Sequence, residues 1–150
     1  MTDRFEQLLL QLGPLFGLKL HPDKIGGCSI AITPSIKVQL QLDLVQENLF
    51  LFSKIIEIPP GKFRENVLRD ALKANAFPDP LSGILCYLPT PNELCLYQSY
   101  PVLILNGERL AGLVGAFVEM AESWHHAIKN GQSSPNLSRP PSSPPFGFKP

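Results

Sequence analysis

Hydrophobic and polar positions follow two different periods along this chain, and their order predicts the fold. Near the N-terminus, Asp3 and Glu6 have the spacing of a capping box, and apolar residues then recur every three or four positions. This pattern predicts an amphipathic helix with the apolar stripe Phe5, Leu8, Leu9, Leu12, Leu15 and Phe16. Because the ring of Pro14 would clash with the carbonyl of Leu10, Gly13 and Pro14 predict a kink or a fresh turn in this helix.

Three strands are expected after the first helix. Residues 28–33 alternate between apolar and polar side chains, and residues 36–43 alternate most clearly of all, which predicts a half-buried antiparallel strand. A turn at Glu47 and Asn48 leads into NLFLFSKIIEI, which is apolar on both faces. A strand of this kind needs cover on both sides.

A second helix and a hairpin are predicted next. Pro59, Pro60 and Gly61 end the third strand and open a helix that has Asn75 as its C-cap. Its apolar stripe consists of Phe63, Val67, Leu68, Ala71, Leu72 and Ala74. Strands at 83–88 and 93–99 then form a hairpin, and symmetric pairing about its loop places Cys86 opposite Cys95.

The last helix is predicted from Asn106, an N-cap candidate, to Asn130 and Gly131, which form a Schellman-type end. The resulting order is helix, three strands, helix, two strands, helix. This order predicts an α+β fold with an antiparallel twisted sheet packed with helices. We expect residues 1–131 to be the folded domain.

Residues 132–150 read QSSPNLSRPPSSPPFGFKP, with six prolines and five serines. Such a composition predicts a disordered tail, because proline lacks a backbone donor and serine adds nothing to a core. The stretch PPSSPPF has an alternative interpretation as a polyproline ligand, and a solvated tail is the favoured one.

Composition narrows the function classes. Hydrophobic residues make up 44% and charged residues 17% of the chain, and thirteen Lys and Arg balance thirteen Asp and Glu. A neutral surface argues against a nucleic-acid partner and against a polybasic membrane anchor. The apolar runs are too short for membrane insertion, and three cysteines without CxxC spacing, with no signal peptide pattern, favour a reducing cytosol. The excess of apolar residues favours an oligomer or a binding module.

The sequence offers no constellation that favours an enzyme, a metal site or a cofactor. His125 and His126 are adjacent, so on a helix they point about 100° apart and do not share one metal ion. A site that adds His21 is the alternative to two surface histidines near a helix C-terminus. Cys86 and Cys95 lie in apolar strands, where a thiol is usually a small core residue.

The order of elements resembles the class I type III secretion chaperones of the CesT/SycE-like family. The resemblance rests on the opening FEQLLLQLG helix, the cysteine in GGCSIAI, the strand IKVQLQLD, the helix PPGKFRENVLRDALKAN and the final PVLILNGERLAGLVGAFVEMAESWHHAI. It covers residues 3–130, and the LNGE turn with the Trp-bearing helix is most similar to chlamydial SycE-like members. The chain departs from the commonly acidic charge of this family.

The resemblance implies a dimer in the bacterial cytosol, with no ATP and no catalysis, that holds an extended segment of a secreted effector. The partner protomer is either an identical chain or a second chaperone. The dimer is expected through the second helix, at Phe63, Val67, Leu68, Ala71 and Leu72. Cargo is expected on a groove lined or supported by Leu8, Leu12, Val38 and Leu40, with direct contact from Phe50 or Phe52, whichever faces outward.

Other classes of protein compete with this interpretation. A small dimeric α+β adaptor or scaffold would bind folded partners rather than an extended segment. A small-molecule binding protein would need a closed apolar pocket with a few polar groups. An enzyme would need His21, His125 or a cysteine brought together by the fold.

Overall fold

The chain forms a five-stranded antiparallel sheet and three α-helices, in the α+β order that the sequence predicts. The computed structural model describes residues 4–43, 45, 47–76 and 83–135. Its elements are α1 (Arg4–Leu15), β1 (Gly27–Ala31), β2 (Lys37–Leu42), β3 (Asn48–Glu57), α2 (Lys62–Asn75), β4 (Ile84–Leu88), β5 (Glu93–Pro101), the 3-10 turn η1 (Val102–Ile104) and α3 (Gly107–Lys129). The strand order is β1-β2-β3-β5-β4, so β5 lies between β3 and β4.

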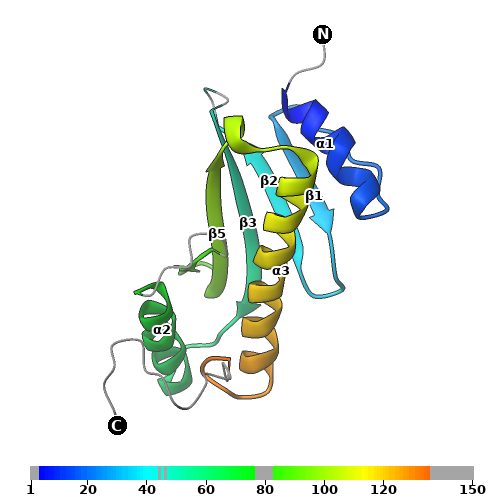
Figure 1. The fold of residues 1–150 in the computed structure, drawn as a ribbon. Helices are drawn as coiled ribbons and strands as arrows, with labels where there is room; N and C mark the ends of the chain where they lie inside the picture. The colour runs from blue at the N-terminus through cyan, green and yellow to red at the C-terminus, as the bar shows by residue number, and fades with distance from the viewer. Residues whose placement is uncertain (1–3, 44, 46, 77–82, 136–150) are drawn as a thin grey trace, which may run out of the picture.

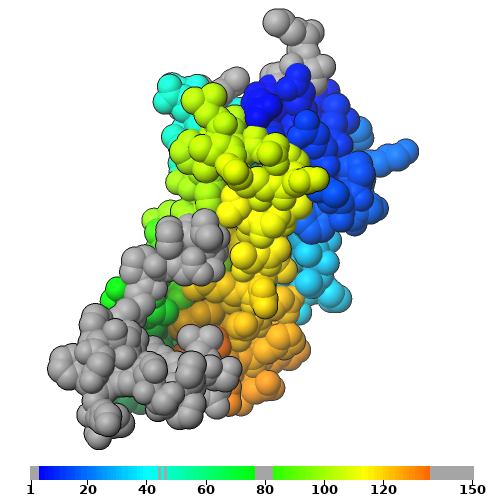
Figure 2. Space-filling model, in the orientation of Figure 1, coloured from blue at the N-terminus to red at the C-terminus, as the bar shows by residue number. Residues whose placement is uncertain are grey.

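One face of the sheet carries the hydrophobic core. The antiparallel register sets Ile30 beside Val38 and Leu85 beside Leu96, and all four side chains are buried. In Figure 1, α1 and α3 lie across this face, and their side chains lie next to each other over the strands in Figure 2. Leu8, Leu9 and Leu12 of α1 belong to the same buried cluster. We call this side of the sheet the helix-covered face.

The first helix continues through Gly13 and Pro14 and ends at Leu15, and a turn follows directly, because the N–H groups of Phe16 and Gly17 donate to the carbonyls of Gly13 and Pro14. Pro14 lies in the last turn of α1, one residue before its end. Gly13 allows the chain to fold back, because a Cβ atom there would lie 2.4 Å from the carbonyl oxygen of Leu18. The N–H of Leu18 donates to the carbonyl of Gly13, which closes this turn.

The third strand is covered on one face only. Leu49, Leu51 and Ile55 are buried against the helices, whereas Phe50 is 39% exposed and Phe52 is half-buried. Within the described part of the chain, helices cover one face of β3, so cover for the other face is left to cargo or another partner. Phe50 and Phe52 also share one face, because side chains two residues apart in a strand point the same way.

The second helix ends differently from the prediction. Ala76 is its C-cap, and the side chain of Asn75 instead pairs with the edge strand β4. The Asn75 amide donates to the carbonyl of Leu85 over 2.8 Å and accepts from the N–H of Leu85 over 2.9 Å. Arg64 adds hydrogen bonds to Tyr87 and Asn92. These contacts fix α2 against the β4–β5 hairpin.

The last helix has the predicted ends. The side chain of Asn106 accepts from the N–H of Arg109, and Gly131 has a φ of +83°. The N–H groups of Gly131 and Gln132 donate to the carbonyls of Ile128 and Ala127, which is a Schellman end. Ser133, inside the predicted tail, donates to Asp70 of α2 over 2.5 Å. The rest of the tail, residues 136–150, lies outside the described residues, so its disorder stays a prediction.

Candidate functional site

The second face of the sheet has no helix over it in the described part of the chain, and it carries a continuous row of side chains across all five strands. The register aligns Ser29, Gln39, Phe52, Tyr97 and Ile84 as successive cross-strand neighbours. Tyr97 and Ile84 are each 38% exposed. We call this side the open face. Because large apolar side chains gather here without cover from the described chain, the open face is the candidate binding surface.

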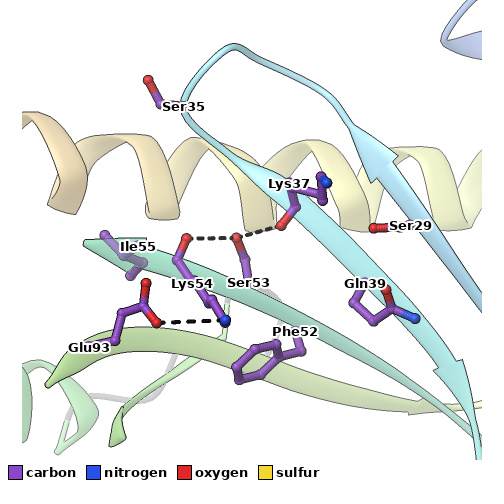
Figure 3. A pocket seen from close by; sticks show the side chains of 9 residues that line it. All are labelled: Ser29, Ser35, Lys37, Gln39, Phe52, Ser53, Lys54, Ile55 and Glu93. Carbon is purple, nitrogen blue, oxygen red and sulfur yellow. Dashed lines mark hydrogen bonds and ion pairs between the residues drawn. The ribbon is translucent and has the colours of Figure 1, made fainter. Parts of the chain in front are cut away.

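A depression of about 560 Å³ lies on the open face between β2 and β3. Figure 3 shows its lining residues, with α3 behind the strands. The lining consists of Ser29, Ser35, Lys37, Gln39, Phe52, Ser53, Lys54, Ile55 and Glu93. The depression therefore combines the ring of Phe52 with polar side chains, a mixture that suits a peptide better than a purely apolar ligand.

Two interactions shape the depression. The hydroxyl of Ser53 donates to the carbonyl of Lys37 over 2.9 Å, which joins β2 to β3 beyond their last paired residues, Gln39 and Phe52. The ammonium of Lys54 lies 3.9 Å from a carboxylate oxygen of Glu93. These partners come from three different strands, so the wall of the depression is set by the sheet register (Figure 3).

The four predicted groove residues on the first helix and second strand have no exposed surface. Leu8, Leu12, Val38 and Leu40 are fully buried in the core under α1 and α3. In this structure they support the sheet and do not line a surface. Phe50 and Phe52, predicted for direct contact, both lie on the open face. Their role in cargo binding stays a prediction.

The predicted interface residues on α2 divide into two groups. Val67 and Ala71 are buried against the domain itself, and Phe63 and Leu68 are partly exposed. Leu72 is 71% exposed. One side of α2 is therefore used for its own packing, and the side marked by Leu72 remains available to a partner.

The histidines do not assemble a site. Nδ1 of His125 lies 2.8 Å from the carbonyl oxygen of Ile55, which anchors α3 to β3, and His126 lies 3.0 Å from Glu122. His21 is exposed in the loop before β1. Among the residues that the structure describes, no three His, Cys, Asp or Glu side chains are grouped so that they could hold a metal ion.

The cysteine pairing is confirmed, because Cys86 is the direct partner of Cys95 across the β4–β5 hairpin. Both thiols are free, as is that of Cys28. A hydrogen bond from Cys95 lowers the pKa of Cys86 to about 7, against the opposing effect of its partial burial. The same hydrogen bond and burial raise the pKa of Cys95. Burial also raises the pKa of Cys28.

Sequence reasoning missed Tyr97 and Ile84 as members of the open face. Strand geometry sets Tyr97 on the opposite face from its buried neighbour Leu96, but the run LCLY is apolar throughout, so the sequence does not mark Tyr97 as exposed. The sequence also does not show that Phe52 pairs with Tyr97, because α2 and β4 lie between β3 and β5 along the chain. Register between strands that are distant in sequence cannot be inferred from a turn.

Comparisons with known proteins identify a family for this chain. The model of the Tir chaperone protein (CesT) family matches residues 7–125. A chain of the ExsC–ExsE complex is similar over 92% of this chain and 98% of its own, with a TM-score of 0.73 and 20% identity. A chain from the Yersinia pestis type III secretion chaperone SycH in complex with a fragment of YscM2 is similar over 79% and 97%, with a TM-score of 0.63 and 22% identity.

A chain of the ExoT–SpcS complex from Pseudomonas aeruginosa is also similar, over 81% of this chain and 97% of its own, with a TM-score of 0.61 and 21% identity. No curated protein sequence matches the chain significantly. None of the helices in the described ranges is long and apolar enough to cross a membrane. The finer resemblance to chlamydial members stays a prediction. Since the family match spans most of the chain, from α1 into α3, the protein belongs to the Tir chaperone protein (CesT) family.

Proposed function

We propose that this protein is a type III secretion chaperone that binds an extended, N-terminal segment of a secreted effector in the bacterial cytosol. Its family supports this proposal, and one solved structure with a similar fold is the HopA1–SchA chaperone–effector complex, at 21% identity and a TM-score of 0.56. Such a function requires no catalytic group and no cofactor, because it consists of binding and release.

The observation that carries the proposal is the open face. Phe50, Phe52, Tyr97 and Ile84 expose apolar surface together, although the same strands bury the alternate side chains completely. A segment laid over this face would remove apolar area from water, at roughly 25 cal/mol for each Å². Its ordering costs conformational entropy, so the affinity stays moderate for the area and release is feasible.

The two edges of the sheet indicate where a strand could be added. Asn75 occupies the backbone groups of Leu85 on β4, so part of that edge is already bonded. On β1, the N–H of Gly27 donates to the Asp23 carboxylate, and its carbonyl accepts from the N–H of Asp23. By strand alternation, the backbone groups of Ser29 point the same way, towards the outer edge of β1. The β1 edge therefore offers main-chain pairing to an extended segment.

We also propose a dimer that uses the exposed side of α2. Leu72 and the partly exposed Leu68 present apolar surface, while Val67, Ala71 and the core-packed Phe63 hold the helix on its own domain. An isologous contact between two α2 helices would cover this surface with the same residues on both sides. The partner is an identical chain or a second chaperone.

The first experiment replaces Phe50 and Phe52 separately with aspartate. The probe is the N-terminal segment of an effector co-expressed with the chaperone, and the measurement is co-purification. We expect each variant to stay folded and to lose capture, because a charge on the open face opposes burial of apolar cargo. Leu103→Asp is the matched control, since Leu103 is 95% exposed and apolar but lies in η1. Capture by both phenylalanine variants would refute the open face as the site.

The second experiment tests the edge. Ser29→Pro removes both the hydroxyl and the backbone N–H that points outward from β1. Ser29→Ala removes only the hydroxyl and keeps the N–H. We expect proline to abolish capture and alanine to preserve it, because proline cannot take part in a strand ladder. Equal loss in both variants would mean that the hydroxyl in the depression, rather than main-chain pairing, binds the cargo.

Limited proteolysis of the co-purified complex distinguishes the chaperone from an adaptor. A chaperone leaves a short protected segment of the partner, whereas an adaptor for folded proteins leaves a whole partner domain intact. Protection of a globular domain would overturn the proposed function.

A further inference from the structure

The β4–β5 hairpin places two thiols at directly opposite positions of neighbouring strands. Cys86 and Cys95 are directly opposite in the antiparallel register, so both side chains lie on the same face. Leu85 directs its N–H and carbonyl to Asn75, away from β5, so Leu85 and Leu96 are a non-hydrogen-bonded pair. Cys86 and Cys95, the next pair, are then a hydrogen-bonded pair.

The spacing of such a pair is compatible with a covalent bridge. Hydrogen-bonded partners in antiparallel strands have Cα atoms about 5.5 Å apart, within the range of roughly 4.4 to 6.8 Å seen for disulfides. Opposed Cβ atoms are about 4.5 to 5.5 Å apart and come closer in non-hydrogen-bonded pairs, so the Cβ atoms of this hydrogen-bonded pair lie towards about 5.5 Å, at least roughly 1 Å beyond the 3.5 to 4.5 Å of a disulfide. The strands must approach a little to close the bond, which favours a bridge that is readily reduced.

The two thiols differ in a way that assigns them separate roles. Cys86 is partly exposed on the edge strand, and its pKa of about 7 makes a large fraction thiolate near neutral pH. Cys95 is buried, and a hydrogen bond with the Cys86 side chain, together with burial, raises its pKa. Its sulfur also donates to the carbonyl oxygen of Glu93 over 3.7 Å. Cys86 is therefore the nucleophile, and Cys95 is the thiol that resolves the intermediate.

We propose that Cys86 and Cys95 are a redox modification site, which forms a reversible disulfide within one chain when the protein meets a peroxide or a small disulfide. With hydrogen peroxide, the Cys86 sulfur attacks one oxygen, the O–O bond breaks, and one water leaves after protonation. Cys95 then attacks the Cys86 sulfenic acid, the S–S bond forms, the S–O bond breaks, and a second water leaves. Two thiols are oxidised and one peroxide is reduced.

Cys28 is an internal control for this proposal. It lies on β1, at the opposite edge of the sheet from β4, and its side chain points into the helix-covered face. Its pKa is raised by burial and by Asp23. A reagent that selects thiolates should therefore modify Cys86 and leave Cys28 reduced. The proposal does not depend on the chaperone function, because it concerns only the hairpin.

The experiment treats the folded, full-length protein with hydrogen peroxide and, separately, with oxidised glutathione, followed by alkylation and mass spectrometry. We expect loss of two hydrogens from the intact mass, two unalkylated cysteines, a peptide pair joined through Cys86 and Cys95, and recovery of both thiols with dithiothreitol. Cys28→Ala should behave like the natural sequence. A bridge between two chains through Cys86, or a bridge that forms only after denaturation, would overturn the proposal.

Two variants separate the roles of the thiols. In Cys95→Ala, oxidised glutathione should leave a stable mixed disulfide on Cys86, because the resolving thiol is absent. In Cys86→Ala, which changes a partly exposed residue, Cys95 should stay reduced under the same treatment. The alkylation rate of Cys86 should follow a pKa near 7. That pKa should rise towards the ordinary thiol value of about 8.5 in Cys95→Ala. An unchanged profile would mean that Cys95 does not activate Cys86.

Discussion

The two faces of β3 carry hydrophobic side chains of similar size, and the structure treats them in opposite ways. Leu49, Leu51 and Ile55 are sealed under the helices, whereas Phe50 and Phe52 remain accessible from the other side. The exposed side of β3 is part of a larger surface, because all five strands contribute side chains to the same row on the open face. An apolar residue at a strand position identifies a surface that favours burial, and the fold decides whether this chain or a partner provides it.

The largest expected effect comes from shortening one large apolar side chain on each face of β3 to alanine. Leu51→Ala should lower the free energy of unfolding by about 3 kcal/mol, because it leaves a cavity in a packed core. Phe50→Ala should lower it by less than about 1 kcal/mol, since its ring is already in contact with water. Urea denaturation at one fixed protein concentration measures both. Equal losses would show that the open face is covered in the free protein, for example by a second copy.

The same contrast occurs on α2, where Val67 and Ala71 face inward and Leu72 faces outward. Leu72→Asp should weaken the proposed dimer by about 2 kcal/mol, or roughly 30-fold in dissociation constant, because it places a charge in an apolar contact. Sedimentation or light scattering over a concentration series measures this change. Lys73→Asp, at an exposed neighbouring position, is the matched control. A chain that is monomeric before any substitution would refute the interface.

A smaller change in the free energy of unfolding is expected at the β4 edge of the sheet. Asn75→Ala removes two hydrogen bonds to the backbone of Leu85, and we expect a loss of about 1 to 2 kcal/mol. Hydrogen exchange should become faster at the Leu85 amide and stay unchanged in β2. Lys73→Ala, two residues earlier in α2 and exposed, controls for general effects on α2. Unchanged exchange at Leu85 would mean that the β4 edge is protected by something other than Asn75.

Most of the fold follows from local pattern. The period-two alternation of β2, the cap at Asn106 and the glycine end at Gly131 depend on neighbours in sequence, and each is found as predicted. The short hairpin loop likewise sets the Cys86 and Cys95 register correctly. Local signals are reliable here because the interactions that they describe close within a few residues.

The rest depends on contacts between distant segments. The end of α1 one residue after Pro14 goes with a contact between non-adjacent residues, since Leu18 folds back and donates its N–H to the carbonyl of Gly13. Asparagine is a residue type that often caps helices, but the Asn75 side chain instead pairs with Leu85 of β4, ten residues further along the chain. The candidate site could be predicted as far as Phe50 and Phe52. Their neighbour Tyr97 required the register between β3 and β5, which no turn specifies.

The smallest effect concerns the C-terminal residues, which carry the aromatic side chains Phe146 and Phe148. Their proline and serine content predicts solvation, so removal of residues 136–150, including Phe146 and Phe148, should shift the melting temperature by less than about 2 °C. Dye binding to the open face should not change. Truncation after Gly131 should cost more, because it also removes the bonds of Gln132 to Ala127 and of Ser133 to Asp70.

The two truncations together separate the tail from the end of the helix. If removal of residues 136–150 alone lowers the melting temperature by several degrees and increases binding of a hydrophobic dye, the aromatic residues dock on the domain. In that case Phe50→Asp and Phe52→Asp should cancel the effect of the truncation, because the docking surface would already be lost. The open face would then be covered by its own chain until cargo displaces the tail. If neither change occurs, the uncovered face is the resting state of the free protein, and the contrast between the two sides of β3 is the property that cargo uses.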